Sequence, residues 1–430
     1  MLLSVSVLFG QYTHEFTLLD TINDGGLAQA IALTPEGNVF LANGDDGLRV
    51  YSFDGNTFSN IAHINDFVDQ VDPQEVAVGS NGTVFFGNYF NGLRAYSHEG
   101  DSLELLAHLD IPIMDFVLGP DETIYTATAM GGYFRHIGAY SYEDSSFNLL
   151  VEGGASAANH HITLGVDGTI FVVHNFTAEY FHHAIEAFCI DGDTIIPIDW
   201  LISTETVGCV NNIATDPDGK IYVSPSMSPI KVFSFEDSTF SLIDSIDCSG
   251  ECVALTVNND GTIFISTLDS LGSYIYDDQT SSYKRTASIE LPLPPYVWQG
   301  DIEVGENGII YVAHGSKGLI AYSYSPLVGT GEIGANVPRQ MHLNQNYPNP
   351  FNPTTIISYD LPTVSDVALT VYDITGREVR TLQKHEQPAG HYEIQWNGVD
   401  NSGNPVSTGL YFARLLADDY SRTIKMVYLE

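Results

Sequence analysis

The segment from Ala30 to Ser52 reads AIALTPEGNVFLANGDDGLRVYS, and the segment from Glu75 to Ser97 reads EVAVGSNGTVFFGNYFNGLRAYS. Both contain an apolar run, a tight turn ending in Gly, a second apolar run and a third run that ends in Tyr-Ser. Five further copies of this unit begin near the following residues: Asp115, His161, Asn212, Ala254 and Asp301. Seven copies at a spacing of about 45 residues indicate a repeat architecture made of short strands.

Repeats of four short strands with this period are typical of β-propeller blades, because one such sheet cannot bury both of its faces alone. Alternating apolar residues in Val39–Leu41 and Val84–Phe86 fit sheets that pack face to face around a ring. The sequence therefore predicts an all-β fold whose main part is a seven-bladed β-propeller with a central channel.

The turn after the first strand of each copy is marked by one residue. In chain order these residues are Gly37, Gly82, Glu122, Gly168, Gly219, Gly261 and Gly308. A turn between two strands commonly needs a left-handed backbone, which glycine adopts without steric cost. Only the third copy, with Glu122, departs from glycine.

The ends of the repeat region predict how the ring closes. Complete copies finish with a fourth strand, such as Phe58–Asp66 or Phe240–Asp247, but the seventh copy stops after Ile320–Tyr324. Phe16–Asp24 (FTLLDTIND) matches Phe58–Asp66 (FSNIAHIND) in register, although it precedes the first copy. We expect this N-terminal segment to supply the outer strand of the last blade, which removes the exposed edges of an open array.

Charge restricts the classes of partner. The chain has a formal net charge of −39, and residues 1–338 contain 44 acidic against 8 basic residues. Such a surface repels nucleic acid and anionic lipid, so neither is expected as a partner. No stretch approaches the roughly 20 apolar residues of a membrane helix, and no membrane span is expected. Residues 1–11 resemble a secretory signal peptide that lacks its basic start.

Four cysteines are compatible with an oxidising compartment. Cys248 and Cys252 share one predicted loop, and we expect them to pair. Cys209 is the alternative partner, and Cys189 is expected to be a buried thiol.

We expect the propeller to span residues 12–325 and a linker to span residues 326–340. After the linker the repeat is no longer found and the sequence pattern changes. Six strand candidates follow in the last 90 or so residues: Ile356–Leu361, Val367–Tyr372, Val379–Leu382, His391–Trp396, Gly409–Leu416 and Thr423–Leu429. Short strands at this density predict a small C-terminal β-sandwich at residues 341–430.

Spaced motifs in this segment occur in a characteristic order. They are NYPNPFNPTT from Asn346 to Thr355, Val371-Tyr372-Asp373 followed by Gly376, then Gly390, Trp396-Asn397-Gly398, Gly403, Gly409-Leu410-Tyr411 and Lys425-Met426. The segment resembles the C-terminal sorting domain of type IX secretion cargo, which is similar to the immunoglobulin-like (Ig-like) domain of flagellar hook-capping proteins. The resemblance implies that the secretion machinery is a partner of residues 341–430. It also implies export to the extracellular space or outer cell surface of a diderm bacterium.

Candidate binding residues follow from aligning the copies on the turn residue. The position seven residues before it is occupied by Ala30, Glu75, Asp115, His161, Asn212, Ala254 and Asp301. Propellers commonly bind ligands where the innermost strands begin, so these side chains are expected to surround the channel mouth. The polar members, Glu75, Asp115, His161, Asn212 and Asp301, suggest a cation site: the oxygens suit calcium and the imidazole favours zinc. Polar residues that bind only water are the alternative.

A second ring is expected six residues after the turn: Asn43, Asn88, Thr128, His174, Pro225, Thr267 and His314. The fourth copy is rich in histidine and has a longer loop, as binding loops of repeat proteins often do. The ligand-binding candidates here are His160, His174, His182, His183, His314, Tyr133, Tyr180 and Trp298.

Three functions remain open. The first is a secreted, non-catalytic binding propeller for a glycan, peptide or surface partner, which the absence of nucleophile, zincin, P-loop and dinucleotide motifs favours. The second is a metal-dependent hydrolase, lactonase or lyase, in which His161 or His174 moves a proton. The residue types resemble those of gluconolactonase-like and streptogramin-lyase-like propellers, without a motif-level match. The third is a structural surface protein.

Overall fold

The computed structural model describes residues 12–65, 73–88, 90–130, 134–154, 159–174, 183–203, 210–225, 229–248, 250–258, 260–277, 279–293, 300–305, 307–326, 341–346, 348–349, 351–361, 365–387, 390–401, 404–417 and 420–428. The signal-like segment at 1–11 and nearly all of the linker at 326–340 lie outside these residues. The chain forms two compact units, residues 1–327 and 328–430.

Among the described residues, the first unit contains seven four-stranded antiparallel sheets, as expected for a seven-bladed propeller. The first three sheets consist of β2 (Ala30–Leu33), β3 (Asn38–Ala42), β4 (Leu48–Phe53) and β5 (Phe58–Ile64); β6 (Pro73–Val78), β7 (Val84–Asn88), β8 (Gly92–Glu99) and β9 (Ser102–Leu109); and β10 (Ile113–Leu118), β11 (Ile124–Met130), β12 (Phe134–Glu143) and β13 (Ser146–Gly154). The next three consist of β14 (Asn159–Leu164), β15 (Ile170–His174), β16 (His183–Asp191) and β17 (Thr194–Ser203); β18 (Val210–Thr215), β19 (Ile221–Pro225), β20 (Ile230–Glu236) and β21 (Thr239–Ile246); and β22 (Cys252–Val257), β23 (Ile263–Thr267), β24 (Ser270–Asp277) and β25 (Ser282–Glu290). One short 3-10 helix, η1 (Gly44–Asp46), precedes β4.

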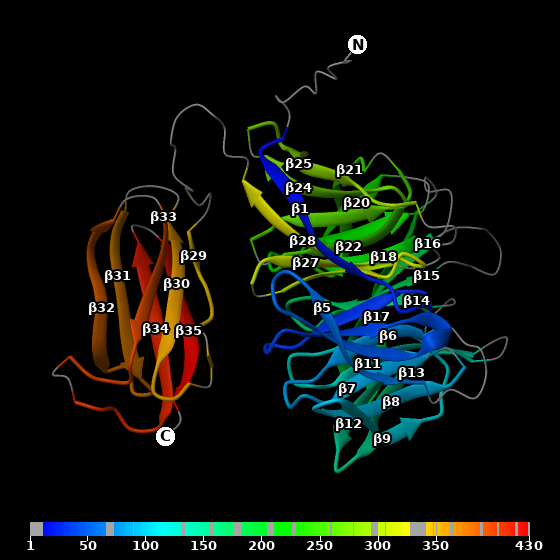
Figure 1. Ribbon diagram of the computed structural model, residues 1–430, viewed down its shortest axis with the longest axis horizontal. Coiled ribbons are helices and arrows are strands. Elements are labelled where there is room, and N and C mark those ends of the chain that lie inside the picture. Colours follow the sequence, from blue (N-terminus) through cyan, green and yellow to red (C-terminus); the bar gives the residue numbers. More distant parts are fainter. Residues whose placement is uncertain are drawn as a thin grey trace. The chain divides into compact units, whose positions relative to one another are not determined.

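The seventh sheet confirms the predicted closure. It is formed by β26 (Asp301–Val304), β27 (Ile309–Ala313), β28 (Leu319–Pro326) and, at its outer edge, β1 (His14–Ile22). Strand β1 pairs antiparallel with β28, and Phe16 lies opposite Tyr324. In Figure 1 the blue strand β1 lies beside the yellow strand β28, so the two ends of the propeller sequence share one blade.

The hydrophobic core of the propeller is divided among its blades. Seven separate clusters of buried side chains each join two neighbouring sheets, and one of them packs Val39 and Leu41 of the first blade against Tyr311 of the last. Neighbouring residues of one strand belong to different clusters: Phe40 faces the second blade, whereas Val39 and Leu41 face the seventh. The alternation seen in the sequence therefore serves two interfaces at once.

The turns behave as the repeat pattern predicts. The six turn glycines have φ values between 74° and 88°. Glu122 adopts the same left-handed backbone with φ of 63°, and its carboxylate accepts a hydrogen bond from Ser80 N of the neighbouring blade. That contact offers a local reason for the exception, because it offsets part of the strain of a non-glycine residue in this region.

The expected disulfide between Cys248 and Cys252 is not formed. Cys189, Cys248 and Cys252 are free thiols, and Cys209 lies outside the described residues. The Cys248 thiol donates a hydrogen bond to Gly250 O at 3.1 Å, and the Cys252 thiol donates to Ala254 O at 3.6 Å. Burial raises the pKa of both thiols and keeps them protonated. Cys189 is half-buried instead of buried.

The second unit is a two-sheet β-sandwich, as the sequence predicts. One sheet consists of β29 (His342–Leu343), β30 (Thr355–Leu361) and β33 (Gly390–Trp396); the other consists of β32 (Glu378–Gln387), β31 (Ser365–Asp373), β34 (Gly409–Ala417) and β35 (Tyr420–Tyr428). The sequence predicted all of these strands except the two-residue β29. Their inner faces bury Trp396, Phe351 and Tyr359 in a separate core.

The NYPNPFNPTT motif holds the last strand of the sandwich in place. Asn349 accepts a hydrogen bond from Val427 N and donates one to Lys425 O, while Phe351 N donates to Val427 O. Asn346 is buried and donates to the Thr355 hydroxyl. The motif therefore has a clear structural task, which is to fix β35 against the start of the domain.

Glycine at the closure point provides a test of the ring. Gly318 has φ of 83°, and a Cβ atom there would lie 2.2 Å from Ile22 O of β1; Gly308, in the same blade, has φ of 74° and open space around it. We expect Gly308→Ala to cost about 1–2 kcal/mol through backbone strain. Gly318→Ala should cost a further 1–3 kcal/mol or so, because the methyl group collides with β1.

Thermal and urea unfolding of both variants measure this difference, with limited proteolysis near residue 14 as a second readout. Equal destabilisation by the two substitutions would contradict a closure that depends on the tight contact between Gly318 and β1.

Candidate functional site

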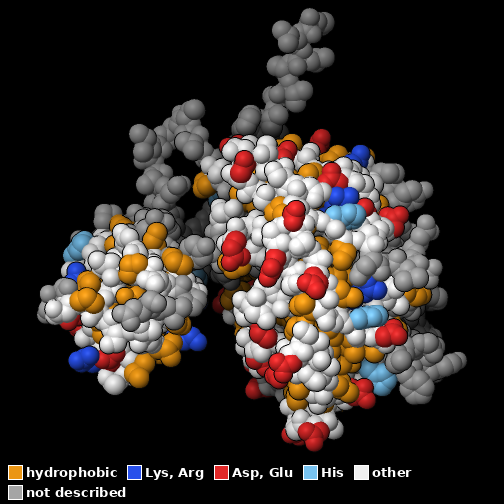
Figure 2. All heavy atoms as spheres, turned by 60° about the horizontal axis from the view of Figure 1, so that its bottom comes forward, with side chains coloured by type: hydrophobic (Ala, Val, Ile, Leu, Met, Phe, Trp, Pro, Cys, Tyr) orange, Lys and Arg blue, Asp and Glu red, His pale blue; other side chains and the backbone are white. Residues whose placement is uncertain are grey.

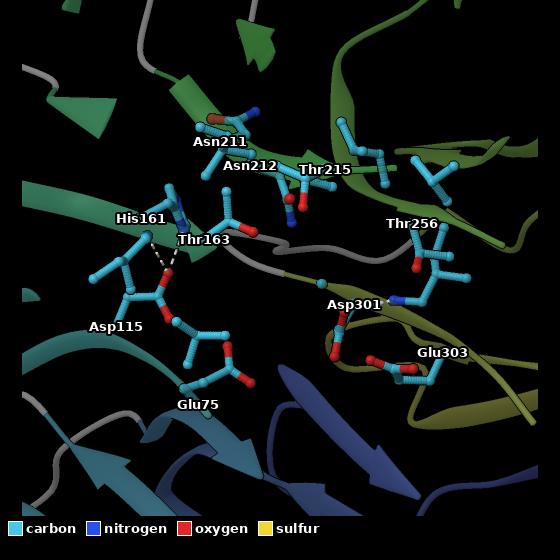
Figure 3. Close-up of a pocket in the computed structure, with 18 of the residues that line it drawn as sticks. Glu75, Asp115, His161, Thr163, Asn211, Asn212, Thr215, Thr256, Asp301 and Glu303 are labelled. Atoms are coloured by element: carbon cyan, nitrogen blue, oxygen red, sulfur yellow. Dashed lines mark hydrogen bonds and ion pairs between the residues drawn. The ribbon is translucent and has the colours of Figure 1, made fainter. Parts of the chain in front are cut away.

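A polar cavity of about 280 Å³ opens on the axis of the propeller, where the innermost strands of the blades converge. Its wall contains all five residues that were predicted to form a cation site: Glu75, Asp115, His161, Asn212 and Asp301. Figure 3 shows Glu75, Asp115 and His161 on one side of this space and Asp301 with Glu303 on the other. The repeat alignment thus identified residues that line one cavity, and their role in binding stays a prediction.

A recurring backbone irregularity aims these side chains at the channel. In five of the innermost strands the register shifts between the first and third residues, for example between Pro73 and Glu75 and between Ile113 and Asp115. The third residue of each of these strands is the ring residue. A β-bulge re-aims the side chain that follows it, so the ring is produced by the same local feature in blade after blade.

Two of the ring carboxylates also connect neighbouring blades. Asp301 Oδ2 accepts a hydrogen bond from Ile31 N at 2.8 Å, across the closure between the seventh and first blades. Asp115 Oδ2 accepts the equivalent hydrogen bond from Ile162 N of the fourth blade at 3.0 Å. These carboxylates are therefore structural ties as well as cavity walls.

Asp115 and His161 form a directed pair inside the cavity. His161 Nδ1 lies 3.3 Å from Asp115 Oδ2, and both side chains are mostly buried. A carboxylate in this position orients the imidazole ring and leaves Nε2 as its other polar atom. The pair can hold or move a proton, or accept a polar ligand.

Burial and mutual repulsion raise the pKa values of three acids at this site. Glu75, Asp301 and Glu303 are half-buried in the wall of the cavity. Burial, followed by the negative charges of Asp115 and Asp301, raises the pKa of Glu75 well above its usual value. Burial raises the pKa of Asp301 to about 6, although two backbone N–H groups oppose the shift. Burial and the charge of Asp301 raise the pKa of Glu303 to about 8.

Several lining residues were missed at the sequence level. Glu303, Thr163 and Thr256 lie two positions after the predicted ring in their own strands, and Gln29 lies one position before it. Because side chains alternate along a strand, the same alignment moved by two residues would have found the first three. Gln29 has no such signal, since it precedes its strand.

The ring does not form a metal centre among the residues that the structure describes. No group of three or more His, Cys, Asp or Glu side chains there is arranged to hold a metal ion. Backbone hydrogen bonds hold the carboxylates against the wall, whereas calcium needs six to eight oxygens that converge within about 2.6 Å of one point. The residues present therefore do not fit the calcium or zinc that their types suggested.

The second predicted ring mostly serves its own loops. Asn88 Oδ1 accepts hydrogen bonds from Phe90 N and Asn91 N, and the Thr128 hydroxyl donates to His136 O. Thr267 likewise bonds within the following turn. Polar residues at this position cap the loop between the second and third strands of a blade, so their recurrence reflects structure.

The histidine and aromatic candidates have different outcomes. His314 is fully buried at the start of the turn that ends at Gly318, and it does not line the cavity, so its predicted ligand-binding role is not supported. Tyr133, Tyr180, His182 and Trp298 lie outside the described residues. His160, His174 and His183 lie on β14, β15 and β16, and their ligand-binding role stays a prediction.

Comparisons with known proteins agree with the two folds. The FlgD Ig-like domain family matches residues 349–419. No curated protein sequence is significantly similar to the chain. Virginiamycin B lyase from Staphylococcus aureus is similar in structure, with a TM-score of 0.54 and 16% identity, covering 73% of this chain and 100% of that chain.

Two further solved structures have the same architecture. A protein from Lactobacillus plantarum has a TM-score of 0.53 and 16% identity, covering 64% of this chain and 90% of that chain. The WD40 propeller domain of Doa1 has a TM-score of 0.51 and 15% identity, covering 72% of this chain and 97% of that chain. At these identities the similarity shows a shared β-propeller fold and not a shared activity.

The buried acids predict a pH dependence of stability. A group whose pKa is raised on folding stabilises the protein below its unfolded pKa, and this contribution is lost as the pH rises through the folded pKa. For Glu303 this stabilising contribution is lost as the pH rises from about 4.5 to about 8. Glu303→Gln mimics the protonated acid, so its free energy of unfolding should exceed that of the wild type by at least ~1 kcal/mol at pH 8.5, and should equal it near pH 4.5.

Urea unfolding across this pH range measures the difference, and the exposed Glu36→Gln serves as the matched control. A difference between Glu303→Gln and wild type that stays constant with pH would contradict the raised pKa of Glu303.

Proposed function

We propose that the chain is an extracellular or cell-surface recognition protein whose propeller binds a ligand in the channel-mouth cavity and whose C-terminal domain directs its export. The observation on which this rests is the cavity itself: polar side chains from six blades line one space on the propeller axis. A space that combines contributions from many blades is the usual position of a ligand site in a repeat fold.

The lining of the cavity favours recognition over catalysis. The polar residues among the described lining are mainly carboxylates, Asn and Thr, together with one histidine, and the lining includes no Ser or Cys nucleophile beside a base. Asn211, Asn212 and Thr163 offer neutral hydrogen-bonding groups, of the kind that bind glycans or peptides. Glycans, peptides and surface partners are therefore the ligand classes to test.

Export is supported by the sandwich domain. Its residues 349–419 match the FlgD Ig-like family, and its motifs resemble type IX sorting domains. Among the described residues, no helix is long and apolar enough to span a membrane. The acidic propeller surface in Figure 2, where Asp and Glu side chains far outnumber Lys and Arg, suits a protein that must stay dispersed outside the cell.

A second candidate function is general acid–base catalysis at the same cavity. The Asp115–His161 pair favours it, because a carboxylate-oriented imidazole is a common general base. In this reading His161 takes a proton from the substrate of a lyase or hydrolase. The neutral amides and hydroxyls around it would position that substrate.

Removal of the sorting domain tests export. In a diderm bacterium with type IX secretion, and behind a functional signal peptide, the full chain should reach the medium or cell surface. A chain ending at residue 340 should remain in the periplasm with its propeller folded. A reporter protein fused to residues 341–430 provides the sufficiency control. Surface delivery of the truncated chain would contradict a sorting role for the domain.

Filling the cavity tests ligand binding. Thr163 lines the cavity from β14, so Thr163→Tyr should block the space and abolish binding on glycan and peptide arrays. The double substitution of His182 and His183 by Ala should leave that binding unchanged.

Binding that survives Thr163→Tyr but disappears with the loop variant would place the ligand on the loop of the fourth blade. Turnover of lactones or esters by the wild type, lost in His161→Gln, would favour the catalytic candidate instead.

A further inference from the structure

The cavity has a strong charge asymmetry. Four carboxylates line it, from Glu75, Asp115, Asp301 and Glu303, and the described lining residues include no Lys or Arg. The nearest basic group is His161, which already lies against Asp115. Burial, and after it repulsion from neighbouring acids, raises the pKa values of Glu75 and Glu303. The cavity therefore lacks a compensating positive charge.

Gln29 provides a second and independent sign of a missing partner. This side chain lines the same cavity and is only 6% exposed, yet its Oε1 accepts no hydrogen bond in the described structure. A buried amide oxygen without a donor is unfavourable, because it has lost its hydrogen bond to water and gained none in return. Because Gln29 and the acids line the same cavity, a hydrogen-bond donor would satisfy both.

The geometry of the acids favours an ammonium group over a metal ion. Both carboxylate oxygens of Asp301 accept backbone hydrogen bonds, from Ile31 N and Ile302 N, and Glu75 Oε1 accepts one from Val76 N. These hydrogen bonds hold Asp301 and Glu75 at their own walls, and no three acidic, histidine or cysteine side chains among the described residues are arranged around one metal position. An ammonium group reaches its acceptors at about 2.7–2.9 Å and donates three hydrogen bonds in different directions, so it suits acceptors that are spread apart.

We propose that the channel-mouth cavity binds an organic cation that bears a primary ammonium group, such as a free aliphatic diamine or the side chain of a lysine in a peptide. The proposal rests on the recognition function inferred above and specifies the chemistry of its ligand. One ammonium group lies between Asp301 and Glu303, within reach of the Gln29 amide oxygen. The pair formed by Glu75 and Asp115 receives a second ammonium group where the ligand has one.

The whole molecule supports such a ligand at longer range. The propeller sequence contains 44 acidic and 8 basic residues between positions 1 and 338. A negative surface attracts cations and raises their concentration near the channel, although added salt screens this effect. Specific binding must therefore be separated from general attraction to the surface.

Calorimetric titration of the full chain with cadaverine (1,5-diaminopentane) at 150 mM salt and pH 8 tests the proposal. Cadaverine should bind with about one molecule per chain, whereas pentane-1,5-diol, of the same length without charge, should not bind. Asp301→Asn combined with Glu303→Gln should weaken cadaverine binding at least tenfold, and Gln29→Leu should weaken it by a smaller factor. The exposed acid Asp218, changed to Asn, is the matched control and should have no effect.

The pH dependence gives a second readout. The titratable groups that face the ligand are Glu75, Asp115, His161, Asp301 and Glu303. A bound cation favours the ionised, deprotonated form of the four carboxyl groups. Cadaverine binding should therefore release protons and weaken as the pH falls from 8 to 5. General attraction to exposed carboxylates predicts almost no proton release over this range.

Two ligand arms identify the source of the ammonium group. Tighter binding of Nα-acetyl-lysine N-methylamide, whose side-chain ammonium group is free, than of cadaverine supports a peptide ligand. Tighter binding of cadaverine supports a free diamine. Calcium binding without amine binding, or amine binding that the Asp301 and Glu303 variants leave unchanged, would overturn the proposal. Array ligands lost in Thr163→Tyr would still support the recognition function, so the two failures are distinguishable.

Discussion

The pairing of β1 with β28 is the contact on which the propeller depends. Each blade buries its two faces only against its neighbours, and the core is divided into seven interfaces with no central one. An open ring would expose two apolar faces and the unpaired edge of β28 to water. The hydrogen bonds between β1 and β28 join segments about 300 residues apart, and so make the burial of every blade conditional on closure.

Closure also creates the site. Closure brings the seven innermost strands to one axis. In five of them a bulge turns the third residue toward it, and Asp301 reaches the same space from the first position of β26, so carboxylates from different blades share one small cavity. Placing like charges together is unfavourable, and hydrogen bonds from Ile31 N and Ile162 N offset part of this cost. The same acids thus fix the spacing of the blades and give the cavity its chemistry. Asp115 and Asp301 therefore cannot be changed without some effect on the ring.

The two units have separate hydrophobic cores. The sandwich has its own core around Trp396, and its NYPNPFNPTT motif fixes β35 within the same unit. The propeller needs none of these contacts to bury its clusters. Separate cores are compatible with the proposed function, in which the sandwich directs export and the propeller binds the ligand.

Local pattern in the sequence determined the repeat, the glycine turns, the closing strand Phe16–Asp24 and the sandwich strands, because these follow from period-two alternation and turn chemistry. It also located Glu75 and Asp301 at the channel mouth, since the register repeats in every blade. Only the tertiary structure decided how those acids face each other, that Gln29 joins them, that His314 is buried and that Cys248 and Cys252 stay unpaired. These outcomes depend on distances between atoms of different blades, which are set by ring closure and leave no local trace in the sequence.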